Sequence, residues 1–205
     1  MIPGQYKKDV FQKMGIAFKR SKQLLDVGCG DCIDVKIFIE KYGLKTHGID
    51  IYKHENVEKI KKLNFKKGSI FNIPYRNGYF DYVFLHDVLH HIDEKRQSQR
   101  MHFKALDELK RVCKKGGQII ILEANRYNPL FYPHMVKMRG HNHFRQSHFK
   151  KIILTKFPHA NFKYFEAHSY PPFLLYPFKI FEFIMENILF FRPFVAYNLA
   201  IIKNE

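Results

Sequence analysis

Gln23-Leu24-Leu25-Asp26-Val27-Gly28-Cys29-Gly30-Asp31-Cys32 is the stretch of sequence that decides the fold of this chain. Residues 24–27 predict a short buried strand, and the two glycines that follow predict a tight turn. Residues 33–42 carry apolar side chains at helical spacing, so a helix is expected directly after the turn. A strand, a glycine turn and a helix in this order are typical of a site that binds a nucleotide-type ligand.

A second predicted strand, Lys45 to Asp50, ends in a carboxylate beside that turn. Parallel strands end at the same edge of a sheet, so Asp50 is expected to accept hydrogen bonds from both ribose hydroxyls of the ligand. The dinucleotide fingerprint needs a third glycine where Ile33 stands, which argues against a dinucleotide. Asp26 adds negative charge at the end of the first strand, and this suits a ligand with an ammonium group better than a pyrophosphate.

These segments resemble the class I S-adenosylmethionine (SAM)-dependent methyltransferases, whose first motif is acid-x-Gly-x-Gly-x-Gly. Further segments match that family in order and spacing over about residues 20–125. They are the adenine-contacting Gly68-Ser69-Ile70, the fourth strand near Phe80-Asp81 and the Leu89-His90-His91 segment. A helix and the Gly116-Gly117 turn then precede a strand from Gln118 to Glu123, as in the family. Cys32 replaces the third glycine of the motif. Ser69 replaces an acid that contacts the adenine, so more backbone contacts are expected there.

The resemblance implies an α/β fold, a Rossmann-like open sheet of seven strands with helices on both faces. The sheet is expected to be mostly parallel, with an antiparallel last strand from Val195 to Lys203. One domain is expected over residues 1–205, with a cover segment at 1–20 and substrate-side insertions at 125–146 and 170–191. The implied cofactor is SAM, bound by Asp26, Gly28, Cys29, Gly30, Asp50, Ile51, Ser69, Ile70 and His86.

Outside the family motifs, the sequence predicts a few further elements from periodicity and turn chemistry. These are a charged helix from Glu55 to Leu63, a strand from Phe65 to Ile70, a helix from Arg96 to Cys113, a helix through Phe157 with Ser147 as its N-cap, and a strand from Asn161 to Ser169.

Methyl transfer from a sulfonium is an in-line displacement, and holding the acceptor in line supplies effective molarities on the order of 10⁵ M or more. A general base is needed only when the acceptor must lose a proton. His91, which follows the fourth predicted strand, is the candidate for that role, with packing or lining of the cofactor site as the alternative. The pair His90-His91 invites a metal interpretation. No carboxylate–histidine pattern nearby in the sequence completes a ligand set, so no metal is expected.

The formal charge of the chain is +16, from 35 lysines and arginines against 19 acidic residues. Such a charge favours nucleic acid, an anionic membrane or an acidic substrate as partner. The alternative is compositional bias, because the basic residues are spread along the whole chain. The apolar content of 46% favours a folded chain over a disordered one.

Cysteine usage and hydropathy predict a cytoplasmic location. Three cysteines without a secreted pattern fit a reducing compartment. No signal peptide and no transmembrane segment are expected. Cys29 and Cys32 fit the tight turn as small residues better than they fit a redox or metal site. A structural zinc site needs four ligands, and this pair offers two.

The leading functional prediction is methyl transfer to a small-molecule or lipid-like acceptor. Residues 170–191 are dense in aromatic side chains, which could enclose an apolar substrate or contact a membrane surface peripherally. An ordinary helix packed on the sheet edge is the alternative for this segment. An RNA or protein methyltransferase that uses the basic surface, and a SAM-binding module without catalysis, are the alternative functions. The sequence does not identify the acceptor.

Overall fold

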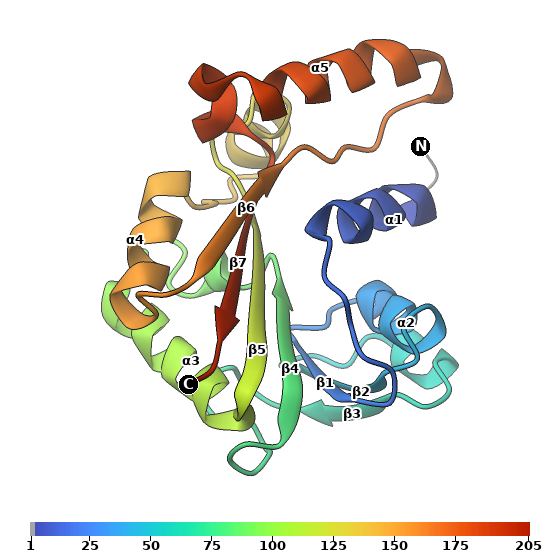
Figure 1. Ribbon diagram of the computed structural model, residues 1–205, viewed down its shortest axis with the longest axis vertical. Coiled ribbons are helices and arrows are strands. Elements are labelled where there is room, and N and C mark those ends of the chain that lie inside the picture. Colours follow the sequence, from blue (N-terminus) through green and yellow to red (C-terminus); the bar gives the residue numbers. More distant parts are fainter. Residues whose placement is uncertain (1–2) are drawn as a thin grey trace.

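One sheet of seven strands organises the molecule, in the order β3-β2-β1-β4-β5-β7-β6 (Figure 1). The computed structural model describes residues 3–205, so the first two residues of the predicted 1–20 segment lie outside the described residues. The strands are β1 (Gln23–Val27), β2 (Lys45–Asp50), β3 (Asn64–Lys67), β4 (Phe80–His86), β5 (Cys113–Ala124), β6 (Asn161–Phe165) and β7 (Tyr197–Lys203).

The pairing of these strands confirms the predicted topology. The first five strands in chain order pair in parallel, whereas β7 pairs antiparallel with both β5 and β6. The last strand therefore lies between two earlier ones. The carboxyl ends of β1, β2, β4 and β5 meet at one edge, which is where parallel sheets bind ligands.

Helices cover both faces of the sheet, as predicted (Figure 1). One face is covered by α1 (Pro3–Met14) and α2 (Ile33–Glu40), and the other by α3 (Gln99–Val112) and α4 (Gln146–Lys156), whereas α5 (Leu175–Asn187) lies across one end of the sheet. Shorter helical segments are Glu55–Lys59, Leu89–His91, Tyr132–Met138, Pro172–Leu174 and η5 (Leu189–Phe194). None of the helices within residues 3–205 has the length and apolar character needed to cross a bilayer.

Two large core clusters lie on the two faces of the sheet, because successive strand residues point to opposite faces. A third, small cluster of Cys29, Cys32 and Val35 lies at the glycine turn. Leu24 of β1 packs with Phe38 and Phe84 in the cluster beneath α1 and α2. Its neighbour Leu25 packs in the cluster shared with α3 and α4. Both leucines are fully buried. β1 is thus covered on both faces, which explains why residues 24–27 are apolar apart from Asp26.

Several predicted boundaries were wrong. Ser147 is not the N-cap of α4, because Arg145 holds that position without a side-chain cap and Ser147 lies in the first turn. The charged helix is a 3₁₀ helix that ends at Lys59 and has no buried residue, so no apolar face supports a longer one. Elsewhere, α3 begins at Gln99, β3 ends at Lys67, β6 ends at Phe165, and β5 begins at Cys113.

Candidate functional site

The glycine turn after β1 is anchored to the end of β2. The amides of Gly28 and Cys29 both donate to the carbonyl of Ile49, at 2.8 and 3.1 Å. Cys32 precedes α2 in a left-handed conformation, with φ of 62°. This conformation favours glycine, and it explains why the family motif has a glycine here. Cys29 and Cys32 are buried with their sulfur atoms 3.7 Å apart, and they fill the turn as small side chains.

Asp50 ends β2 with its carboxylate held toward the turn. Its Oδ2 accepts a hydrogen bond from the Gly30 amide at 2.9 Å, and its Oδ1 accepts one from the Tyr52 amide at 3.0 Å. Two amides thus fix the carboxylate in one orientation at the carboxyl edge of the sheet. An oxygen with a second lone pair at such a place can accept a ligand hydroxyl.

A cavity of about 560 Å³ opens at this edge of the sheet. That volume lies within the usual range for small-ligand sites, roughly 300–1,000 Å³. Of the predicted site residues, seven line it: Gly28, Gly30, Asp50, Ile51, Ser69, Ile70 and His91. The structure therefore brings together residues from the ends of four strands, β1 to β4, that are far apart in the sequence. Phe71, Ile92 and Met101 add apolar lining that the sequence did not single out.

Asp26, Cys29 and His86 were predicted for the same site, but they do not line this cavity. The side chain of Asp26 is buried, and burial raises its pKa, as does the neighbouring Asp34 carboxylate. His86 lies against α1 and α2, where its Nδ1 is 2.6 Å from Oδ2 of Asp34. Lys7 of α1 forms a salt bridge with Asp34 at 3.0 Å.

Lys7 and Asp34 form an ion pair that the sequence analysis missed. Burial alone would raise the pKa of Asp34, but the charge and hydrogen bond of His86, together with Lys7, lower it to about 2. Asp34 is therefore a charged link between α1 and α2. No local sequence pattern reveals it, because its partners lie in α1 and β4.

Two further carboxylates, Asp87 and Glu123, hold the loop after β4. Glu123 is fully buried at the end of β5, and its Oε1 accepts from the amides of Val88 and Leu89 at 3.1 and 2.7 Å. Its Oε2 lies 2.7 Å from Nδ1 of His90. Oδ1 of Asp87 accepts from the amide of Ala124 at 2.7 Å. The rule that singled out Asp50, a carboxylate at the carboxyl end of a strand, would also have found Glu123.

His91 borders the cavity with its side chain half exposed. Its Nδ1 lies 3.6 Å from Oε2 of Glu94. Burial lowers the pKa of His91, and the neighbouring His90 lowers it further. The imidazole is consequently neutral near pH 7 and can accept a proton, which is what a general base at this place requires.

Gly28 and Gly30 offer a matched test of the turn. Both have positive φ, 73° and 46°, so alanine at either position costs roughly 1–2 kcal/mol of stability through backbone strain. A Cβ on Gly28 would also meet Cγ2 of Val88 at 2.7 Å, whereas a Cβ on Gly30 meets nothing within 4 Å. We expect Gly28→Ala to lower the free energy of unfolding in urea more than Gly30→Ala. Equal losses would show that the turn is not packed against Val88.

Comparisons with known proteins find similarity to methyltransferases. The family model described as a methyltransferase domain matches residues 25–121. An uncharacterised methyltransferase of Schizosaccharomyces pombe is 30% identical over 131 residues, which is 56% of this chain and 44% of that protein. Norajmaline N-methyltransferase of Rauvolfia serpentina is 30% identical over 116 residues, 51% of this chain and 36% of that protein. The chain spans less than half the length of these two relatives.

A solved structure supports the same fold over nearly the whole chain. A SAM-dependent methyltransferase from Archaeoglobus fulgidus superposes with a TM-score of 0.68 at 18% sequence identity. The superposition covers 98% of this chain and 94% of that one. The match extends well beyond residues 25–121, so it includes the antiparallel strands at the end of the sheet.

Proposed function

We propose that the chain is a class I SAM-dependent methyltransferase and that it transfers the methyl group of SAM to a small-molecule or lipid-like acceptor. The observation that carries the proposal is the cavity where Gly28, Gly30 and Asp50 meet at the carboxyl edge of the sheet. Its volume of about 560 Å³ suits a ligand of this size, and the cavity wall at Gly28 has no room for a side chain.

Each predicted residue has a task in this proposal. Asp50 binds the ribose hydroxyls, and the amides near Gly28 and Gly30 face the other end of the cofactor. Ile51, Ser69 and Ile70 contact the adenine, with apolar contact in place of the missing acid. The remaining proposed cofactor-binding residues are Asp26, Cys29 and His86. They lie behind the residues that line the cavity, where they support the glycine turn and the strand ends. The domain is proposed to extend over residues 1–205, with the 1–20 segment as cover.

When bound, SAM supplies a methyl group activated by its sulfonium. The chain contributes position, because an acceptor held in line gains most of the available rate. The clamped loop after β4 holds His91 at the cavity edge, where it removes a proton if the acceptor is a hydroxyl or an ammonium group. An acceptor that carries no such proton needs no base, and His91 would then only line the site.

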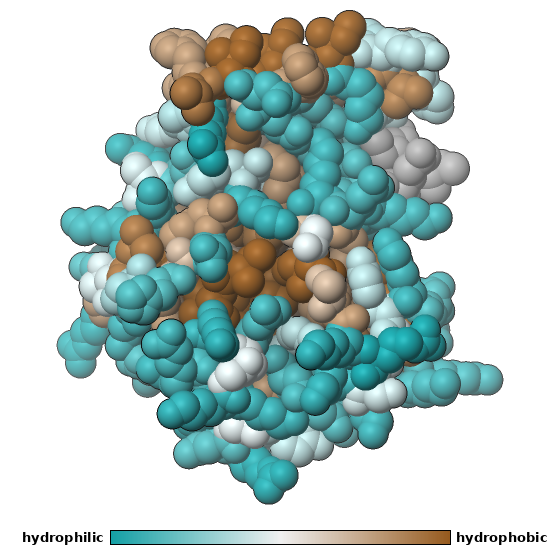
Figure 2. All heavy atoms as spheres, viewed as in Figure 1, coloured by the Kyte–Doolittle hydropathy of each residue, from teal (hydrophilic) through white to brown (hydrophobic). Residues whose placement is uncertain are grey.

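The surface of α5 and η5 favours a lipid-like acceptor. Lys13 of α1 bonds Glu182 and Glu186 at 3.0 and 2.8 Å, so α5 turns its acidic residues inward. Large apolar side chains of α5, of η5 and of the preceding Pro172–Leu174 segment are exposed: Phe173, Tyr176, Ile180, Phe183, Leu189 and Phe190. Apolar atoms accordingly gather over α5 in Figure 2. The exposed apolar patch can enter a membrane surface, and the chain's charge of +16 attracts anionic lipids. Together they fit peripheral contact with an anionic membrane.

We therefore expect the protein to float with anionic liposomes at low salt and a Phe183→Asp/Phe190→Asp variant to lose more than tenfold of that binding. Each buried phenylalanine contributes roughly 1.5–3 kcal/mol, which the aspartates remove. Tyr52→Asp is the matched control, because Tyr52 is equally exposed but lies outside α5 and η5. A wild-type protein that never floats would remove the membrane contact and leave an apolar small molecule as acceptor.

The activity is tested by incubating the purified protein with SAM labelled in its methyl group and with separated lipid, small-molecule, RNA and protein fractions. Label in the lipid or small-molecule fraction is the expected result. Label in RNA, with binding that falls steeply with salt, would establish the first alternative instead. SAM binding without label in any fraction would indicate a binding module.

The three cysteines are free, which fits the proposed cytoplasmic location.

A further inference from the structure

Four histidines from two distant segments meet beside the cofactor cavity. His90 and His91 follow β4, whereas His141 and His143 come from the 125–146 segment. The ring centroids of His90 and His143 are 4.2 Å apart, and those of His90 and His91 are 4.0 Å apart. Two overlapping triads place their ligand atoms within 4.8 Å of one another: Asp87, His90 and His143, and His90, His91 and His141.

His143 is the residue that most needs a partner. It is 3% exposed, and neither of its ring nitrogens has a hydrogen-bond partner. Leaving a buried donor or acceptor unsatisfied costs roughly 1–3 kcal/mol. A bound cation would satisfy one nitrogen of His143. Packing alone does not explain why an imidazole, rather than an apolar side chain, occupies this place.

His90 has the hydrogen bonding of a metal ligand. Its Nδ1 lies 2.7 Å from Oε2 of the fully buried Glu123. Such a carboxylate fixes the ring and the tautomer, and it leaves Nε2 with its lone pair for a metal ion. Asp87 offers a carboxylate oxygen next to it, from a loop held by the amide of Ala124.

We propose that Asp87, His90 and His143 bind one divalent transition-metal ion, with zinc as the reference ion. Two imidazoles and one carboxylate are a ligand set for zinc and for iron, whereas magnesium and calcium prefer oxygen ligands alone. Asp87 also lines the cofactor cavity. The ion would therefore border the space for the methyl acceptor and could bind an oxygen or nitrogen atom of it.

This inference replaces the sequence-based expectation that no metal is bound. That expectation looked for ligands near His90 along the chain. Glu123 and His143 reach His90 only because β5 lies beside β4 and the 125–146 segment folds back over the loop.

The test uses the full chain without a histidine tag, dialysed against a chelator to remove bound metal. Its zinc affinity is measured by competition with a chromophoric zinc indicator. One ion per chain is expected. We expect His143→Gln to weaken binding by about 100-fold or more and Glu123→Gln by roughly 10–100-fold. Cobalt loaded in place of zinc should give visible absorption bands that His143→Gln removes. Because binding is measured without methyl transfer, this outcome is independent of the proposed function.

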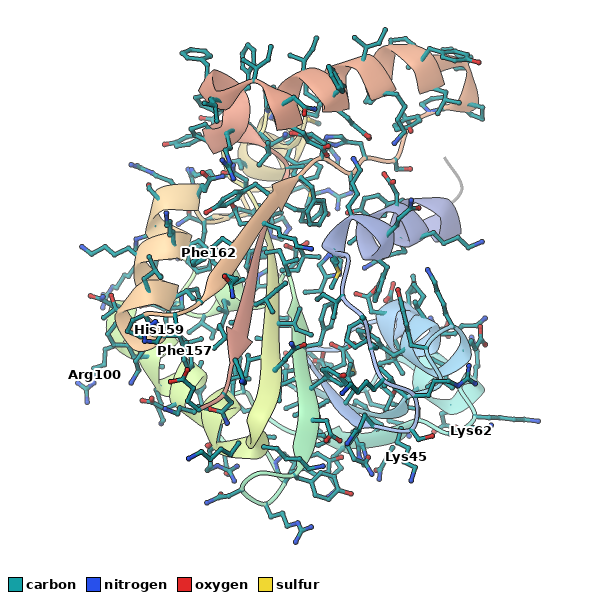
Figure 3. All side chains as sticks on the ribbon, in the orientation of Figure 1. Lys45, Lys62, Arg100, Phe157, His159 and Phe162 are labelled. Atoms are coloured by element: carbon teal, nitrogen blue, oxygen red, sulfur yellow. The ribbon has the colours of Figure 1, made fainter. Side chains whose placement is uncertain are left out.

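Two matched variants make the result decisive. His159 is exposed between α4 and β6 (Figure 3), so His159→Gln should leave zinc affinity unchanged. His141→Gln should have a smaller effect than His143→Gln, because His141 belongs only to the triad of His90, His91 and His141. A larger effect of His141→Gln would place the ion in that triad and overturn the assignment. Equal zinc affinity in the wild type and in a folded His143→Gln variant would overturn the site itself.

Discussion

Asp50→Ala is expected to weaken the binding of SAM by about a hundredfold or more. In the proposed site the change would remove two charge-assisted hydrogen bonds to the ribose, each worth roughly 1.5–3 kcal/mol. It also removes the acceptor that holds the amides of Gly30 and Tyr52. Isothermal titration calorimetry with SAM and with S-adenosylhomocysteine measures the loss directly.

Two controls separate the ribose contact from damage to the turn. Asp50→Asn keeps the size of the side chain and one acceptor oxygen, so an intermediate loss is expected. Asp107→Ala removes an exposed carboxylate on α3, and SAM affinity should stay unchanged. Unchanged affinity in Asp50→Ala would contradict the assignment, and so would a wild-type preference for NAD over SAM.

A chain truncated after Phe194 is expected to lose cooperative folding altogether. β7 is the strand that joins β6 to the sheet, and it pairs with β5 along its whole length. The truncation also exposes the core around β5, where Leu199, Ala200 and Ile202 are buried. Circular dichroism across a urea titration should show no sharp transition.

A pair of leucines provides the matching point variants. Leu199 is fully buried in β7, so Leu199→Ala should lower the free energy of unfolding by roughly 2–5 kcal/mol. Leu189 is 76% exposed, and Leu189→Ala should change that free energy by less than about 0.5 kcal/mol. A truncated chain that unfolds with the wild-type midpoint would show that β7 contributes nothing to the core.

The fold was predictable because its main signals are local. The apolar run at Leu24, the glycine turn and the following helical spacing each depend on neighbouring residues, and the sheet confirms their order. Boundaries failed where packing rather than local chemistry decides. Ser147 has the side chain of an N-cap, yet the N-cap of α4 is Arg145, two residues earlier. The 55–63 segment has helical residues but no buried face to extend the helix beyond Lys59.

The candidate site was predictable only in part, for the same reason. Gly28, Gly30 and Asp50 were found because strand ends and turns place them by rule, and all three line the cavity. Glu123 is also a carboxylate at the carboxyl end of a strand, but it was predicted only as the last residue of an apolar strand. The contact of His90 with His143 depends on how a long connection folds back, which no periodicity in the sequence encodes.

The position of β7 has a consequence for synthesis on the ribosome. β6 has β7 as its neighbour in the sheet, and the residues between Phe165 and Tyr197 must be added before that neighbour exists. At about 5–20 residues per second, this interval lasts a few seconds. Until β7 has emerged and docked, Phe162 and Tyr164 belong to a strand with no docking edge, and the side of β5 that binds β7 has no partner either. The nascent chain therefore passes through a window in which two open strand edges are available to chaperones or to other nascent chains.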